Sequence, residues 1–349
     1  MEIKDFLEET TQATGASGYE TQVASIFRRY IEGVSDEVWT DPLGNVIAVR
    51  RGPRENSPKI MLAGHMDEIG LVITRIEDGG FLRFTKIGGI DERTLLAQEV
   101  RVHGRSTLTG VIGAKPPHIQ EPDERRKSVP MDKLFIDVGL EEEKVRELVS
   151  VGDIATIKRK VISLNCDTLA GKAMDDRAGV AVVLATFREL VRLKSQVTVY
   201  GVATVQEEVG TRGAQTSTYG IDPDIGIGID VTFADRDDLV EERAKLGKGP
   251  VIAIGPQVHP KVYQRMVETA RKRGIDYQID PSPHPFGTDT APIQVARSGV
   301  ASILVSIPLR YMHTSVETLK LRDIEAAGRL LAEFISSIDA EFVEGLSCF

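Results

Sequence analysis

Histidines and carboxylates stand directly after apolar runs of this sequence, or at the start of an expected helix. The clearest case is the run at 59–64, which leads into His65 and, one residue later, Asp67. A continuous apolar run is typical of a buried parallel strand, and open α/β sheets place their chemistry beyond the carboxyl ends of such strands. The residues in comparable positions are His65, Asp67, Asp175, Asp176, Glu207, Glu208, Asp230 and His313.

Two histidines among several carboxylates, without a cysteine, form the ligand set of a divalent ion such as zinc, cobalt or manganese. The set is larger than one tetrahedral zinc ion needs. It suits two ions about 3.5–4 Å apart that share a carboxylate. An additional glutamate would then take a proton from a water held by the ions. The residue types therefore predict metal-assisted hydrolysis, provided that the strand ends converge.

Each of these pairs also has an ordinary structural interpretation. His65 and Asp67 could be a hydrogen-bonded histidine and a solvated carboxylate at a strand end. Residues 175–176 could merely balance the positive end of a helix, and residues 207–208 could lie in a solvated turn. The metal interpretation is favoured because the strong apolar runs of the α/β part each end in a potential ligand.

The elements that must position these residues alternate between strands and helices. Apolar runs that predict strands lie at 59–64, 197–205, 225–229 and 301–307. Helical spacing of apolar residues is found at 173–191, 260–273 and 322–338, and in a helix launched by the turn at 14–20. Ser17 and Glu20 in that turn have the spacing of a capping box. We therefore expect an α/β fold with a mixed, mostly parallel sheet flanked by helices.

The stretch at 69–162 has a different sequence pattern, in which short β runs are separated by glycine-rich turns. Many short strands with such turns predict a small barrel or sandwich. We expect a discontinuous α/β domain, residues 1–68 and 163–349, that carries the candidate ligands, and an inserted β domain, residues 69–162. A charged, proline-bearing loop at 115–132 in the insertion is expected to be mobile or to form an assembly contact.

Composition narrows the class of protein. The chain has 349 residues and a formal net charge of −9, which suits two domains and argues against a nucleic-acid or anionic-membrane partner. No apolar run approaches the roughly 20 residues that cross a bilayer. The start of the sequence has no signal-peptide pattern, and its two cysteines suit a reducing compartment. We therefore expect a cytoplasmic protein.

Five stretches resemble the motifs of metallopeptidase family 42, the TET-type dinuclear glutamyl and leucyl aminopeptidases that have also been labelled endoglucanases. In chain order these are GHMDEIG (64–70), AMDDRAG (173–179), VQEEVGTRG (205–213), GIDVT (228–232) and RYMHT (310–314). The resemblance covers nearly the whole chain. It implies the phosphorylase/hydrolase-like α/β fold of these enzymes, with a small β-barrel inserted after the first motif.

The resemblance also implies which residues bind metal. His65 and Asp230 would complete the ligand shell of one ion. Glu208 and His313 would complete that of the other, and Asp175 would bridge the two. The cofactors implied are two divalent ions per subunit, with zinc or cobalt first and manganese as an alternative.

Further residues are expected to act beside these ligands. Glu207 would be the general base and acid, and Asp67 would accept a hydrogen bond from the second ring nitrogen of His65. The peptide bond between residues 175 and 176 would be cis. Arg310 and the turn that contains Asp289 fall near the same edge, and both substrate contact and local structural hydrogen bonds remain open for them.

The implied activity is removal of N-terminal residues from short peptides by a water that bridges two metal ions. The implied partners are identical copies, which in this family form hollow dodecamers, built from dimers, through the inserted β domain at 69–162 of the catalytic chain. A metal-dependent deacylase or carboxypeptidase remains an alternative, as do a scaffold protein and a glycoside hydrolase, which would need two carboxylates and no metal. The side-chain preference, the native metal and the oligomeric state stay open.

Overall fold

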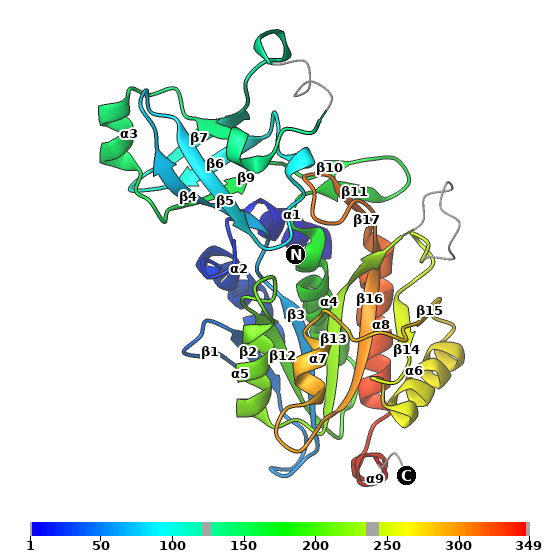
Figure 1. Cartoon of the computed structure of the whole chain (residues 1–349). Coiled ribbons are helices and arrows are strands. Elements are labelled where there is room, and N and C mark those ends of the chain that lie inside the picture. Colours follow the sequence, from blue (N-terminus) through cyan, green and yellow to red (C-terminus); the bar gives the residue numbers. More distant parts are fainter. Residues whose placement is uncertain (1, 121–126, 235–243, 347–349) are drawn as a thin grey trace.

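A mixed sheet of eight strands forms the centre of the computed structural model, which describes residues 2–120, 127–234 and 244–346 (Figure 1). Its order is β1 (Glu37–Thr40), β2 (Val46–Arg50), β12 (Thr198–Thr204), β3 (Lys59–His65), β13 (Ile225–Phe233), β16 (Ala301–Leu309), β14 (Val251–Ile254) and β15 (Gln278–Pro281). The central strands β12, β3, β13 and β16 are parallel, whereas β2 and β14 flank them in the antiparallel direction. The carboxyl ends of the central strands therefore meet at one edge.

Helices cover both faces of this sheet. The helices on one face are α1 (Ile3–Gln12), α2 (Thr21–Ile31), α4 (Met174–Leu190), α6 (Pro260–Arg273) and α8 (Leu321–Ser336). The shorter α5 (Arg212–Ile221) and α7 (Thr290–Gln294) lie on the other face, and α9 (Ala340–Glu344) lies near the carboxyl end. Alternate residues of β3 serve the two cores, because Leu62 packs on the α4 side and Met61 on the α5 side. The predicted α/β fold is confirmed.

A closed six-stranded barrel leaves the sheet directly after β3 (Figure 1). Its strands are β4 (Gly70–Ile76), β5 (Leu82–Ile87), β6 (Glu99–His103), β7 (Thr107–Gly113), β8 (Phe135–Asp137) and β9 (Ile154–Ile157). It has a core of its own around Leu71, Val100 and Ile136. The sequence predicted a barrel here but missed β8 and the short helix α3 (Glu142–Leu148). Residues 121–126 of the charged loop lie outside the described residues.

A three-stranded sheet lies between the barrel and the edge of the large sheet where the carboxyl ends of its central strands meet (Figure 1). It contains β10 (Ile162–Ser163), β11 (Thr168–Gly171) and β17 (Glu317–Lys320). Strand β11 leads into α4, and its antiparallel pairing with β17 sets Gly171 opposite Glu317. This pairing holds the start of α4 beside the segment that follows β16. Among the described residues, no helix is both long and apolar enough to cross a membrane.

Candidate metal centre

The end of β3 lies directly against the start of α4, which places His65 beside Asp175 and Asp176. Gly64 permits this approach, because a Cβ atom there would lie 2.8 Å from the carbonyl carbon of Gly179. The buried Asp176 joins the two elements by accepting hydrogen bonds from the backbone N–H groups of His65 (3.2 Å) and Gly179 (2.8 Å). The peptide bond between Asp175 and Asp176 is cis, so that prediction is confirmed.

Two groups of potential metal ligands meet at Asp175. One group is His65, Asp175 and Asp230, and the other is Asp175, Glu208 and His313, with the ligand atoms of each group within 4.8 Å of one another. Asp175 presents Oδ1 to His65 Nε2 and Oδ2 to His313 Nε2, both at 3.2 Å. The sequence analysis named these five residues, and the structure brings all of them together.

Strand β13 runs further than the sequence predicted. The apolar run suggested a strand that ends just before Asp230, but β13 continues to Phe233 because each residue from Ile225 onward is paired with β16. Asp230 therefore projects from within a strand, and its Oδ1 accepts a hydrogen bond from the N–H of Val231 (2.7 Å). Its carboxylate nevertheless reaches the first ligand group.

Glu207 lies beside the ligands without belonging to either group. Its Oε2 is 3.9 Å from His65 Nε2, and only 9% of its side chain is exposed. Burial raises the pKa of Glu207 to about 9, and the neighbouring Asp230 adds to this effect. Glu207 and Glu208 lie in the turn after β12, which ends at Thr204, so this one turn supplies both a ligand candidate and an adjacent carboxyl group.

Asp67 is fully buried and accepts hydrogen bonds from three directions. Its Oδ1 accepts from the N–H of Glu207 (2.9 Å), and its Oδ2 accepts from the N–H of Glu208 (3.1 Å) and from the Ser17 hydroxyl (2.6 Å). His65 Nδ1 lies 3.1 Å from the backbone oxygen of Asp67 and 3.4 Å from its Oδ1. Asp67 thus orients His65 through backbone and side chain, and it also holds the turn after β12.

The capping-box prediction for Ser17 and Glu20 is wrong. Helix α2 begins at Thr21, and the side chains of Ser17 and Glu20 bond elsewhere. The spacing in sequence could not reveal this, because Asp67, the partner of Ser17, follows β3, and Gln206, a partner of Glu20, lies in the turn after β12.

Glu317 is a buried residue that the sequence analysis did not identify. Its Oε2 accepts hydrogen bonds from the N–H groups of Met174 (2.7 Å) and Asp175 (3.2 Å), and its Oε1 accepts from the N–H of His313 (2.8 Å). One carboxylate therefore ties together the two segments that carry Asp175 and His313. Burial raises its pKa to about 8. No local pattern marks this residue, since its role depends on the pairing of β11 with β17.

The barrel also contributes to the site. The backbone oxygen of Gly89 lies 2.8 Å from His313 Nδ1, which leaves Nε2 to face Asp175 and Glu208. A Cβ atom at residue 89 would come within 2.8 Å of the same Nδ1, so this approach requires glycine. Such a contact to the second ring nitrogen is how metal-binding histidines are usually oriented.

The two residues left open by the sequence have structural contacts. Asp289 is buried and accepts a hydrogen bond from the Thr204 hydroxyl at 2.5 Å, and burial raises its pKa to about 6. Arg310 pairs through its backbone with Thr318.

The electrostatics of the cluster favour added positive charge. Burial raises the pKa of Asp230 to about 8, with Asp175 contributing in the same direction. Hydrogen bonds to Asp175 and Glu208 raise the pKa of His313 to about 11. At Asp175 burial opposes ionisation, but contacts with both histidines outweigh it and hold the pKa low. Two nitrogen-and-oxygen groups that share one carboxylate, in a setting that attracts cations, fit two divalent ions.

Comparison with known proteins gives concordant matches over the whole fold. Residues 44–330 match the family model described as M42 glutamyl aminopeptidase. The chain is 36% identical over 343 residues to the lysyl aminopeptidase of Pyrococcus furiosus, covering 96% of this chain and 97% of that protein.

Solved structures agree with this match. The TET aminopeptidase from a marine sediment thaumarchaeote superposes with a TM-score of 0.93 at 36% identity, covering 99% of both chains. The Pyrococcus horikoshii TET1 peptidase, which can assemble into a tetrahedron or a large octahedral shell, superposes with a TM-score of 0.85 at 34% identity, covering 97% of this chain and 100% of that one.

Proposed function

The chain belongs to the M42 glutamyl aminopeptidase family, and from that premise we propose that it removes N-terminal residues from short peptides with two divalent ions per subunit. The observation that carries the proposal is the shared Asp175, whose two oxygens each lie 3.2 Å from a different histidine. A carboxylate between two ligand groups is the arrangement that a pair of ions requires.

The proposal assigns a role to each residue of the cluster. His65, Asp175 and Asp230 would hold one ion, and Asp175, Glu208 and His313 would hold the other. Bound there, the ions would polarise the scissile carbonyl and lower the pKa of the attacking water. Zinc and cobalt suit the mixed nitrogen and oxygen donors, with manganese as an alternative.

Glu207 would carry the proton in this reaction. Its carboxylate would accept a proton from the attacking water and deliver it to the leaving amine, which is the usual task of a glutamate beside a hydrolytic metal site. Support for this comes from its place beside His65 in the first ligand group and from the fixed turn that presents it. Asp67 would hold that turn and the His65 ring in position.

The test is an aminoacyl-p-nitroanilide panel on metal-stripped protein, with zinc, cobalt and manganese added back singly. We expect background turnover without metal and restored turnover with at least one ion, because the donor set cannot polarise the carbonyl unaided. The controls are N-acetylated substrates and peptides assayed for release of their C-terminal residue. Preference for either would favour a deacylase or a carboxypeptidase instead. Full activity in excess chelator would refute the metal mechanism.

We extend the proposal to assembly, with the barrel as a contact region between copies of the chain. The tetrahedral or octahedral assembly of the Pyrococcus horikoshii relative supports this, since that chain superposes over its whole length, barrel included. Closed symmetric assemblies are the common form of homo-oligomers. Sedimentation velocity of the purified protein should therefore give a species well above 38.2 kDa. A monomer across the micromolar range would contradict the proposal.

A further inference from the structure

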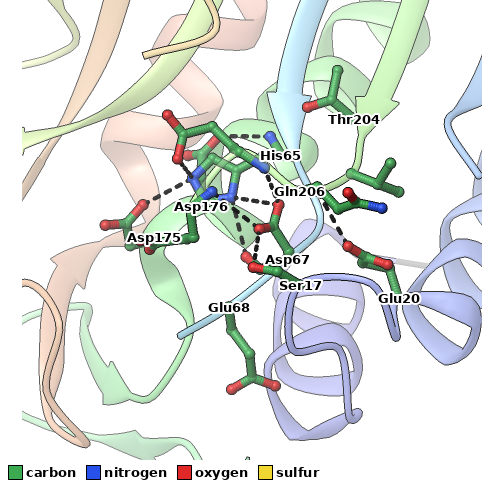
Figure 2. Close-up of polar contacts among 12 residues, drawn as sticks. Ser17, Glu20, His65, Asp67, Glu68, Asp175, Asp176, Thr204 and Gln206 are labelled. Atoms are coloured by element: carbon green, nitrogen blue, oxygen red, sulfur yellow. Dashed lines mark hydrogen bonds and ion pairs between the residues drawn. The ribbon is translucent and has the colours of Figure 1, made fainter. Parts of the chain in front are cut away.

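Three consecutive backbone N–H groups in the turn after β12 donate to buried carboxylates (Figure 2). The N–H of Gln206 donates to Glu20 Oε1 at 3.1 Å. The N–H groups of Glu207 and Glu208 donate to the two oxygens of Asp67 at 2.9 and 3.1 Å. The backbone of the proposed base and of a proposed ligand is therefore fixed by two side chains from distant parts of the sequence.

Both carboxylates are held by one short turn near the start of the chain. The Ser17 hydroxyl donates to Asp67 at 2.6 Å, and the N–H of Gly18 donates to Glu20 Oε1 at 2.7 Å. The turn is itself attached to the exit of β3, because the N–H of Glu68 donates to the Gly15 oxygen at 2.9 Å. Glu20 is only 6% exposed, so its carboxyl group is built into this contact and not a surface group that happens to reach it.

The Gln206 backbone needs such a contact. Its φ of +56° lies in the left-handed region, which a residue with a side chain adopts at a cost and keeps only where its surroundings fix it. Glu20 accepts the N–H of this same residue. Without that acceptor, Gln206 would be free to return to an ordinary conformation, and the direction of the next residue, Glu207, would change with it.

We propose that Glu20 is a positioning residue that aims Glu207 at the reacting water by holding the N–H of Gln206. This inference rests on the proposed function, in which Glu207 is the general base. It assigns to Glu20 a role in catalysis although the residue touches neither substrate nor a ligand side chain in the described contacts. Ser17 supports the same turn through Asp67.

The test compares Glu20→Ala with Glu20→Gln at saturating metal and well below the unfolding temperature. We expect Glu20→Ala to lower kcat about 10- to 100-fold with KM nearly unchanged, because small misplacements of a catalytic group cost rate and not ground-state binding. Both hydrogen bonds of Glu20 end on Oε1, so a carboxamide oxygen can accept both. Glu20→Gln should therefore recover most of the lost kcat.

A second readout does not depend on turnover. Zinc titration against a chromophoric chelator should show two ions per chain in Glu20→Ala, with several-fold weaker binding of the ion held by Glu208, since residue 208 belongs to the same turn. Glu20→Asp, which keeps the charge but withdraws the carboxylate by one methylene group, should share both defects in milder form. If Glu20→Ala does not fold, Glu20→Asp replaces it in both measurements.

Phe27→Leu is the matched control for lost stability. Phe27 lies on α2, the helix that follows Glu20, and is fully buried with its ring against that of Phe6. A lowered Tm in Phe27→Leu should leave kcat intact. Wild-type kcat and zinc affinity in Glu20→Ala would overturn the inference, as would equal losses of kcat in Phe27→Leu. A wild-type enzyme without aminopeptidase activity would instead refute the proposed function, and zinc affinity would still test Glu20.

Discussion

Replacing Glu207 with glutamine should reduce kcat about 10²- to 10⁴-fold, the range that a positioned general base contributes, while two metal ions remain bound. The amide has the shape of the carboxyl group but cannot accept the proton of the attacking water. Glu207 belongs to neither group of ligand atoms, so its loss should leave metal affinity unchanged. Steady-state kinetics and metal content of the same preparation provide the measurement.

Glu208→Gln is the matched control, because the neighbouring residue sits in the same turn but belongs to the second ligand group. We expect it to weaken one ion, and excess metal should restore part of its activity. No concentration of metal should rescue Glu207→Gln. Turnover near wild type in Glu207→Gln would exclude Glu207 as the base, and loss of an ion would identify it as a ligand instead.

Most of the candidate ligand cluster was predictable from the sequence for a physical reason. His65 and Glu208 follow apolar runs closely, and parallel strands bring their carboxyl ends to one edge, so residue type and position in the run suffice. Asp230 shows the limit of this reasoning. Its strand continues because of pairing with β16, which the sequence of β13 alone does not display.

The residues that hold the candidate ligands in place were much harder to predict from the sequence. Ser17 and Glu20 have a local spacing that indicates a helix cap, yet Ser17 bonds Asp67, 50 positions away, and Glu20 accepts from Gln206, 186 positions away. Glu317 and Gly89 have no local sequence signal. Glu317 reaches its partners because β17 pairs with β11, and the Gly89 oxygen reaches His313 because the barrel lies beside that residue. Local patterns predict elements and chemistry, whereas long-range hydrogen bonds to backbone N–H groups emerge only from the packed fold.

Asp175 is the residue whose removal should have the widest effect on metal binding. It is the only member common to the two described ligand groups, and each of its oxygens faces a different histidine. Asp175→Ala should therefore weaken both ions, and activity should fall to background at any practical metal concentration. His313 belongs to one group, so His313→Ala should release one ion and keep the other.

The contrast between these variants tests whether one carboxylate is shared. Metal content after dialysis, measured by mass spectrometry, should approach two ions per chain for the wild type, one for His313→Ala and none for Asp175→Ala. Burial raises the pKa of Asp230 and the charge of Asp175 adds to this effect, so removing Asp175 removes a repulsion and we expect the variant to stay folded. Circular dichroism separates lost metal from lost fold. A folded Asp175→Ala protein that keeps one ion at full affinity would show that the two groups bind independently and that Asp175 does not bridge them.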